Sequence, residues 1–263
     1  MRVRLLHSPQ TSGARNMAID EALLIHKTPT LRFYSWDPPC VSIGYFQSAQ
    51  REVDEASCRS YGVGIVRRPT GGKAVLHEHE LTYSLVLPEN SVGENVISSY
   101  KTISRAFVGA LRSLGIPVEV RTGAEPRGHS PLCFQAVSYY ELVLHGKKIM
   151  GSAQSRQNGM LLQHGSLLLD VDYTKLFACL RFGHAARRAS DLEGFVTGIN
   201  RECGRRLTAA GLAQKITACA RRELGFSFYR AGLSADEERT ARSLEKGKYE
   251  NPTWTFKSAF ARN

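Results

Sequence analysis

The pattern of hydrophobic and polar positions divides the chain into helical and extended segments. Helical patterning predicts helices over 14–27, 52–60, 92–114, 172–180, 207–224 and 235–248. Short runs rich in β-branched and aromatic residues predict strands over 2–8, 30–36, 40–46, 63–66, 74–77, 81–87, 116–120, 138–144, 149–154 and 160–169. This order predicts an α+β fold with a mixed, largely antiparallel sheet flanked by helices.

The predicted strands stop near residue 169, and the last part of the chain is helical and basic. We therefore expect a main domain over 1–205 and a small C-terminal helical extension over 206–263 packed on it. Residues 181–206 are basic and lack a clear period, which predicts an irregular, mobile connection. Trp254 and Phe256 are available to pack the tail against the rest of the chain.

The chain is strongly basic, with 35 Lys and Arg against 24 Asp and Glu, a formal net charge of +11. Such a field attracts anionic partners, either nucleic acid or small acidic proteins. The basic residues are scattered, and no helix-turn-helix pattern precedes the strands. This distribution disfavours a nucleic-acid-binding module.

The cysteines and apolar runs indicate a cytoplasmic protein without membrane contact. No apolar run approaches the roughly 20 residues of a transmembrane helix, and residues 1–13 lack the apolar core of a signal peptide. The six cysteines are widely spaced, without a CxxC or a zinc-ligand rhythm. We therefore expect free thiols in a reducing compartment.

One cysteine and one lysine flank a predicted β-meander. Cys133 lies fifteen residues before Lys148, which follows a tight His-Gly turn. A nearby ammonium favours the thiolate, and a thiolate can accept an acyl group from a thioester and pass it to an amine. Without a clear Cys-His-Asn set this pair favours acyl transfer over proteolysis, with His129 and His164 as available bases. Spacing alone also fits a buried structural thiol at Cys133 and an ordinary solvated lysine at Lys148.

Residues 67–73 form a basic turn with two glycines, a pattern that suits an anion-binding loop. The turn lacks P-loop spacing, so on its own it fits a plain hairpin equally well. Residues 77–80 (HEHE) do not match the helical HExxH pattern and have no evident third ligand, so no metal site is predicted. We expect His77 to close the loop, and Glu78 and Glu80 to be partly solvated.

Three motifs, taken in order, resemble the biotin/lipoate protein ligase and octanoyltransferase superfamily. Residues 67–77 (RRPTGGKAVLH) resemble its RRxxGG(G/R)AVxH signature, and residues 147–154 (KKIMGSAQ) resemble its (R/K)KxxGSAQ signature. Residues 163–168 (QHGSLL) match its QHGSxL strand. The segment that begins at Cys133 resembles the CFxxxSxYEL segment of the cysteine-bearing octanoyltransferases, where ATP-dependent ligases usually carry an Asn-Asp type segment. The resemblance covers about residues 1–180.

The resemblance implies an octanoyltransferase of lipoate biosynthesis, with the fold of a biotin/lipoate protein ligase catalytic domain, no cofactor and no metal. Its donor would be octanoyl-acyl carrier protein, and its acceptor a lysine of the glycine-cleavage H protein or another lipoyl domain. It implies Cys133 as the acyl-thioester nucleophile and Lys148 as the residue that lowers the pKa of that thiol. The residues that it implies for substrate binding are Arg68, Thr70, Gly71, Gly72, Lys73, Ala74, His77, Gly151, Ser152, Ala153, Gln154, His164 and Gly165.

Two related activities remain as alternatives. In an ATP-dependent lipoate–protein ligase the shared motifs would hold lipoyl-adenylate, with Lys148 at its carbonyl and phosphate. In a lipoyl or octanoyl amidotransferase the acyl group would move between two lipoyl domains. The acyl donor distinguishes these two activities from the octanoyltransferase: free lipoate with ATP for the ligase, and an acylated lipoyl domain for the amidotransferase. Both protein partners of the octanoyltransferase are typically acidic, which agrees with the charge of +11.

Overall fold

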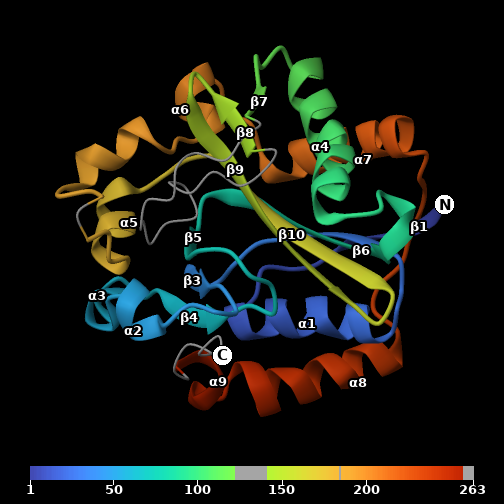
Figure 1. Ribbon diagram of the computed structural model, residues 1–263, viewed down its shortest axis with the longest axis horizontal. Helices are drawn as coiled ribbons and strands as arrows, with labels where there is room; N and C mark the ends of the chain where they lie inside the picture. The colour runs from blue at the N-terminus through green and yellow to red at the C-terminus, as the bar shows by residue number, and fades with distance from the viewer. Residues whose placement is uncertain (122–140, 184, 257–263) are drawn as a thin grey trace.

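An eight-stranded mixed sheet forms the centre of the protein (Figure 1). The computed structural model describes residues 1–121, 141–183 and 185–256. The strand order is β11-β1-β2-β6-β10-β9-β8-β7. Their bounds are β1 (Arg2–His7), β2 (Thr30–Tyr34), β6 (Glu80–Pro88), β7 (Glu119–Arg121), β8 (Glu141–Leu144), β9 (Lys147–Gln157), β10 (Met160–Leu168) and β11 (Ser227–Arg230). β1 pairs in parallel with β2 and β11, and the other pairs are antiparallel, which confirms the predicted mixed, largely antiparallel sheet.

Two tight turns build the β8–β9–β10 meander. Asn158 and Gly159 have φ values of 53° and 77°, and His145 and Gly146 have values of 50° and 77°. Positive φ at both central residues is typical of the two-residue hairpin turns that match the twist of paired strands. The meander predicted from the Asn-Gly and His-Gly steps is therefore confirmed for strands β8 to β10.

Helices cover both faces of the sheet (Figure 1). α4 (Val96–Ser113) and α7 (Ala209–Leu224) pack on one face; α1 (Gly13–Ile25) packs on the other, and α8 (Ala235–Leu244) packs on α1. Alternation along β6 sends Leu81, Tyr83, Leu85 and Leu87 into the core under α4 and α7. The residues between them face α1. Within the described ranges, no helix is both long and apolar enough to cross a membrane.

A second, three-stranded sheet lies beside the first one. Its order is β4-β3-β5, with β3 (Cys40–Ile43), β4 (Gly64–Arg67) and β5 (Val75–His77). Three short helices surround it: α2 (Ala49–Glu52), α3 (Glu55–Ser60) and α5 (Tyr173–Cys179). This small sheet carries the 67–73 turn from the end of β4 to the start of β5.

The connection over 181–206 is more ordered than its sequence predicts. It contains a 3₁₀-helix, η2 (Ala189–Gly194), and a short helix, α6 (Ile199–Cys203). Phe182, Leu192 and Val196 are buried against the small sheet. The prediction of an irregular segment is therefore wrong for these two elements. Helices of five or six residues are too short to show an amphipathic period.

The C-terminal part supplies the predicted helices and one strand that was not predicted. β11 pairs in parallel with β1, and α7 packs against α4 in the largest core cluster. After α8 the chain continues as a π-helix, η3 (Glu245–Tyr249), and α9 (Pro252–Phe256); one further 3₁₀ turn, η1 (Glu89–Ser91), follows β6. Trp254 packs as expected, because its indole Nε1 donates to the Arg67 carbonyl oxygen at 2.9 Å. The division of the chain at residue 205 remains a prediction.

Candidate active site

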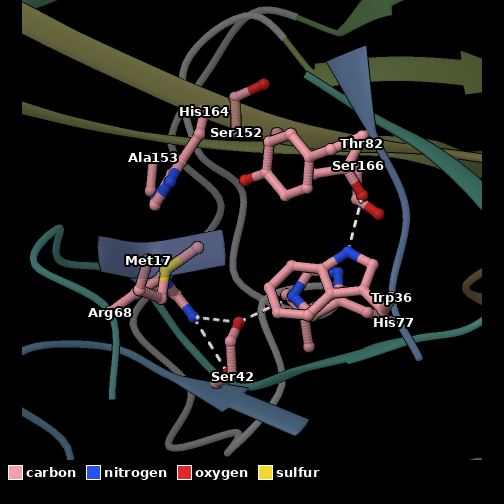
Figure 2. Close-up of a pocket in the computed structure, with 14 residues that line it drawn as sticks. Met17, Trp36, Ser42, Arg68, His77, Thr82, Ser152, Ala153, His164 and Ser166 are labelled. Atoms are coloured by element: carbon pink, nitrogen blue, oxygen red, sulfur yellow. Dashed lines mark hydrogen bonds between the residues drawn. The ribbon is translucent and has the colours of Figure 1, made fainter. Parts of the chain in front are cut away.

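A pocket with about 380 Å³ of empty space, including its open mouth, lies between the small sheet and the α1-facing side of the large sheet (Figure 2). The predicted substrate-binding residues that line it are Arg68, His77, Gly151, Ser152, Ala153, His164 and Gly165. The other lining residues are Met17, Tyr34, Trp36, Ser42, Val75, Thr82 and Ser166. Folding thus brings residues from all three sequence motifs together around one cavity.

The remaining predicted substrate-binding residues lie around the pocket and do not line it: Thr70, Gly71, Gly72, Lys73, Ala74 and Gln154. The first four belong to the 67–73 turn that borders the pocket, and Ala74 follows it directly. Gln154 follows Ala153 in β9, and alternation places its side chain on the opposite face. There its amide Nε2 donates to Gln163 Oε1 at 3.0 Å. This geometry favours a role for Gln154 in the sheet.

A buried acid–imidazole–hydroxyl chain forms one wall of the pocket. The Nδ1 of His77 lies 2.7 Å from Glu80 Oε1, and its Nε2 lies 2.7 Å from Ser42 Oγ. A carboxylate only accepts hydrogen bonds, so Nδ1 carries the proton. The ring also stacks on Trp36, with centroids 4.0 Å apart and planes 10° apart. His77 is therefore held in one orientation at the edge of the pocket.

The expectation that Glu80 is partly solvated is wrong. Its carboxyl is buried under the His77 ring, whereas Glu78 is half-buried and pairs with Lys175. Burial alone opposes ionisation of Glu80, but the charge and hydrogen bond of His77 outweigh it and lower the pKa of the carboxyl. Among the described residues, no group of three or more His, Cys, Asp or Glu is placed to hold a metal ion.

A second chain of the same kind runs behind His164. Its Nε2 lies 2.6 Å from Thr70 Oγ1, and its Nδ1 lies 3.2 Å from Asp20 Oδ2. Burial lowers the pKa of His164, although the Asp20 carboxylate partly opposes this effect. The neutral ring then donates from Nδ1 to Asp20 and accepts the Thr70 hydroxyl proton at Nε2. This chain joins the 67–73 turn to α1.

The Asp20 carboxylate is the anchor of that second chain. Its Oδ1 accepts from Arg32 Nη1 and from Ser84 Oγ, both at 2.7 Å, and its Oδ2 accepts from the Tyr34 hydroxyl at 3.0 Å. Both Asp20 and Arg32 are fully buried. Burial opposes ionisation of Asp20, but the Arg32 charge and the His164 hydrogen bond outweigh it and lower the pKa of the carboxyl.

Arg68 holds the shape of the turn from inside. Its Nη2 donates to the carbonyl oxygens of Gly71 at 2.8 Å and Lys73 at 2.7 Å. Its Nη1 donates to the carbonyl oxygen and the hydroxyl of Ser42 at 3.0 and 3.1 Å. The side chain is buried, and these contacts direct its N–H groups at the protein. In this geometry Arg68 stabilises the pocket wall. Its guanidinium does not present its charge to an anionic ligand.

The lysine predicted to activate the thiol is buried at the start of β9. Lys148 Nζ forms an ion pair with the Glu141 carboxylate, and both side chains are at most 5% exposed. The backbone of Lys148 is fixed as well, because its N–H donates to Phe195 at 2.9 Å and its carbonyl accepts from Thr197 at 3.1 Å. The alternative of an ordinary solvated lysine is wrong. Lys148 does not line the pocket, but it is the second residue of β9, which does.

The predicted nucleophile, Cys133, lies outside the described residues, and so does His129. The described chain stops at Arg121 and resumes at Glu141, and these two residues pair across β7 and β8. Glu141, the first described residue after the segment that contains Cys133, is itself the ion-pair partner of Lys148. Of the described cysteines only Cys203 is not buried; Cys40, Cys58, Cys179 and Cys219 are buried.

Several site residues were missed by the sequence analysis. Asp20, Trp36, Ser42 and Glu141 stood within segments that resemble the family, without a role, and Thr82 was read only as a strand residue. One signal was available for Thr82. Like Glu80 and Ser84, it is a polar residue among the buried residues of β6, and buried polar groups are usually hydrogen-bonded.

Gly44 provides a test of how the pocket turn is held. A Cβ at Gly44 would lie 1.9 Å from the Gly72 carbonyl oxygen, so Gly44→Ala must displace the turn. We expect a loss of about 1–3 kcal/mol in the free energy of unfolding, and a weaker affinity for the acyl substrate. Denaturant titration and substrate binding measure the two effects. Gly232→Ala is the matched control, because a Cβ there meets nothing within 4 Å. Equal stability of the two variants would contradict the close contact.

Sequence comparisons agree with this fold and pocket. The profile of the lipoyl protein ligase A/B catalytic domain matches residues 12–221. The chain is 41% identical over 256 residues to the octanoyltransferase LipM of Carboxydothermus hydrogenoformans, a match that covers 94% of this chain and 95% of the relative. Fold and pocket thus define a lipoyl protein ligase A/B catalytic domain. Within that class, the chain belongs to the octanoyltransferase LipM family, which confirms the resemblance seen in the sequence.

Solved structures give the same result for the fold. The structure of lipoate-protein ligase A bound with ATP superposes with a TM-score of 0.84 at 28% identity, covering 98% of this chain and all of the other. A second solved structure is the bi-partite lipoate protein ligase of Thermoplasma acidophilum, from a study that includes its E2 lipoyl domain. It superposes with a TM-score of 0.83 at 27% identity, and the match covers 100% of this chain and 99% of the other.

Proposed function

We propose that the chain is an octanoyltransferase that moves octanoyl from octanoyl-acyl carrier protein to a lysine of a lipoyl domain, with the glycine-cleavage H protein as acceptor. The observation that carries the proposal is 41% identity, over nearly the whole chain, to a protein named octanoyltransferase. The pocket supports it, because Met17, Trp36, Val75 and Ala153 offer apolar surface to a hydrocarbon chain.

The reaction proceeds in two acyl transfers. The Cys133 thiolate attacks the thioester carbonyl of the donor, the carrier thiolate leaves and takes up a proton, and an octanoyl thioester forms on Cys133. The amine of the acceptor lysine then attacks that thioester. It loses a proton, the amide forms, and the Cys133 thiol is released. No nucleotide is consumed, because the first thioester already carries an activated acyl group.

Lys148 supports the first transfer in this proposal by stabilising the Cys133 thiolate. Glu141, the first described residue after the segment that carries Cys133, forms the ion pair with Lys148, and it pairs with Arg121, the last described residue before that segment. Burial of Lys148 keeps water from screening its charge. The Glu141 carboxylate compensates that charge, and removal of either partner would leave the other buried and uncompensated.

The donor tests the proposed activity. The wild-type protein is given a lipoyl-domain acceptor and one of three donors: octanoyl-acyl carrier protein, free lipoate with ATP, or an octanoylated second lipoyl domain. We expect a mass increase of one octanoyl group on the acceptor with the carrier donor and without ATP. Modification only with free lipoate and ATP would assign the chain as a ligase, an outcome consistent with its similarity to the ATP-bound ligase. Modification only from the second lipoyl domain would assign an amidotransferase.

A further inference from the structure

A surface groove on the other side of the large sheet plays no part in the pocket described above. It is bordered by one side of α4, by Val120 of β7 and by Glu223 near the end of α7, and it encloses about 910 Å³ including its open mouth. α4 and β7 lie next to each other at this end of the molecule (Figure 1).

The groove has a basic rim and an apolar floor. Lys101, Arg105 and Arg112 are four and seven residues apart along α4, so they project from the same side of the helix. All three are exposed, and none forms an ion pair with a carboxylate of the described residues. The acid on the rim, Glu223, is already paired with Arg222 at 2.9 Å. Val108 of α4 contributes to the floor.

One further cavity shares lining residues with both the groove and the acyl pocket. Ser104 of α4 lines both the groove and this cavity, which lies between α4 and strands β8 to β10. Ser152 lines both the cavity and the acyl pocket. Glu141, the partner of Lys148, also lines the cavity. The groove and the acyl pocket therefore lie on opposite faces of the large sheet, and each shares one lining residue with the cavity between α4 and the sheet.

We propose that this groove docks the acidic carrier protein that delivers the acyl thioester, an inference that rests on the proposed function. The basic side chains on the rim have no carboxylate partners among the described residues, and they surround an apolar floor. A protein surface with carboxylates around an apolar patch is complementary to it in both charge and hydrophobicity. The separation between groove and pocket decides between the two acidic partners. A carrier protein presents its acyl group on a long prosthetic arm, so its body docks away from the pocket. An acceptor presents a lysine side chain, so its body must approach the reacting carbonyl directly.

Charge reversal on the rim tests this assignment. The variant Lys101→Glu/Arg105→Glu is compared with wild type for acyl loading, followed by intact mass, from octanoyl-acyl carrier protein and from the neutral small thioester octanoyl-N-acetylcysteamine. We expect KM for the carrier protein to rise about tenfold or more, with loading from the small thioester unchanged. Wild-type KM for the carrier is expected to rise with salt, and that of the variant to depend less on salt.

Two further variants control for net charge and for folding. Arg59→Glu/Lys246→Glu makes the same change of charge at exposed positions of α3 and η3, remote from α4, and is expected to load like wild type (Figure 1). Lys101→Gln/Arg105→Gln removes charge without reversing it and is expected to give an intermediate KM. Thermal unfolding of each variant reports whether the fold is kept.

The outcomes separate docking from the proposed function. If Lys101→Glu/Arg105→Glu is loaded from the carrier protein at the wild-type rate, the docking site is wrong. The docking site is also wrong if loading from the carrier protein and from the small thioester slows equally. Normal loading with slower transfer to the lipoyl domain would assign the groove to the acceptor and overturn the donor assignment. If wild type takes no acyl group from either thioester, the proposed function itself fails, and that result is visible before any variant is compared.

Discussion

Replacing Cys133 with alanine is expected to abolish the octanoyl adduct on the enzyme and to slow transfer to a lipoyl domain by a factor on the order of 10⁴ or more. No other group takes over the covalent step when a nucleophile is removed, because the acyl group then has no thioester on the enzyme from which to transfer. Intact mass after incubation with octanoyl-acyl carrier protein measures the adduct, and hydroxylamine should remove it from the wild-type protein.

Cys203 provides the matched control, because it is the described cysteine that is not buried. Cys203→Ala should form the adduct at the wild-type rate. The other described cysteines are protected by burial, which raises the pKa of the Cys40 thiol far above its usual value, for example. Full transfer activity in Cys133→Ala would contradict the acyl-enzyme mechanism, while the acyl pocket would remain a valid assignment.

The second large effect is on stability. Asp20→Ala is expected to lower the free energy of unfolding by about 3–5 kcal/mol, because it leaves the fully buried Arg32 guanidinium without its carboxylate. The same substitution removes the acceptor of the His164 Nδ1 proton. Denaturant titration with two spectroscopic probes measures the change. Acyl-substrate affinity should fall as well, because His164 and Thr70 lose their fixed orientation.

An exposed ion pair is the control for Asp20→Ala. Glu193 pairs with Arg201 at 2.7 Å, and both side chains are more than 40% exposed. Solvent screens such pairs, so Glu193→Ala should change stability very little. If Asp20→Ala were no more destabilising than Glu193→Ala, the buried ion pair would not be an anchor of the fold.

The stability contributed by Asp20 should also depend on pH in a defined direction. Its folded-state pKa lies below the ordinary value of 3.8, so the folded protein binds the proton less readily than the unfolded chain. The contribution is therefore complete above pH 3.8 and is lost as the pH falls through the lowered folded-state pKa. The stability difference between wild type and Asp20→Ala should accordingly shrink on acidification below pH 3.8, and a constant difference would contradict the lowered pKa.

The sequence alone was sufficient for the elements with a clear local signal. The β8–β10 meander follows from its Asn-Gly and His-Gly turns, and the long helices α4 and α7 follow from their apolar period. The family followed from motifs at fixed spacing, and those motifs named seven residues that line the pocket. Each of these signals is contained in a short segment, so no knowledge of distant contacts is required.

Tertiary structure decided which charged and polar groups are buried and with what partners. Asp20 and His164 are 144 residues apart in sequence, and Ser42 and His77 are 35 apart, so no local pattern joins them. Glu80 looked solvated because its sequence neighbours are polar, but in the fold its carboxyl is buried and accepts hydrogen bonds from His77 and Thr82. The burial of Lys148 against Glu141 likewise depends on strand pairing and on the 195–197 backbone. The sequence therefore determined the family and the candidate chemistry. Only the fold determined the two buried hydrogen-bond chains that shape the pocket, because burial and pairing arise between segments that meet only in the folded state.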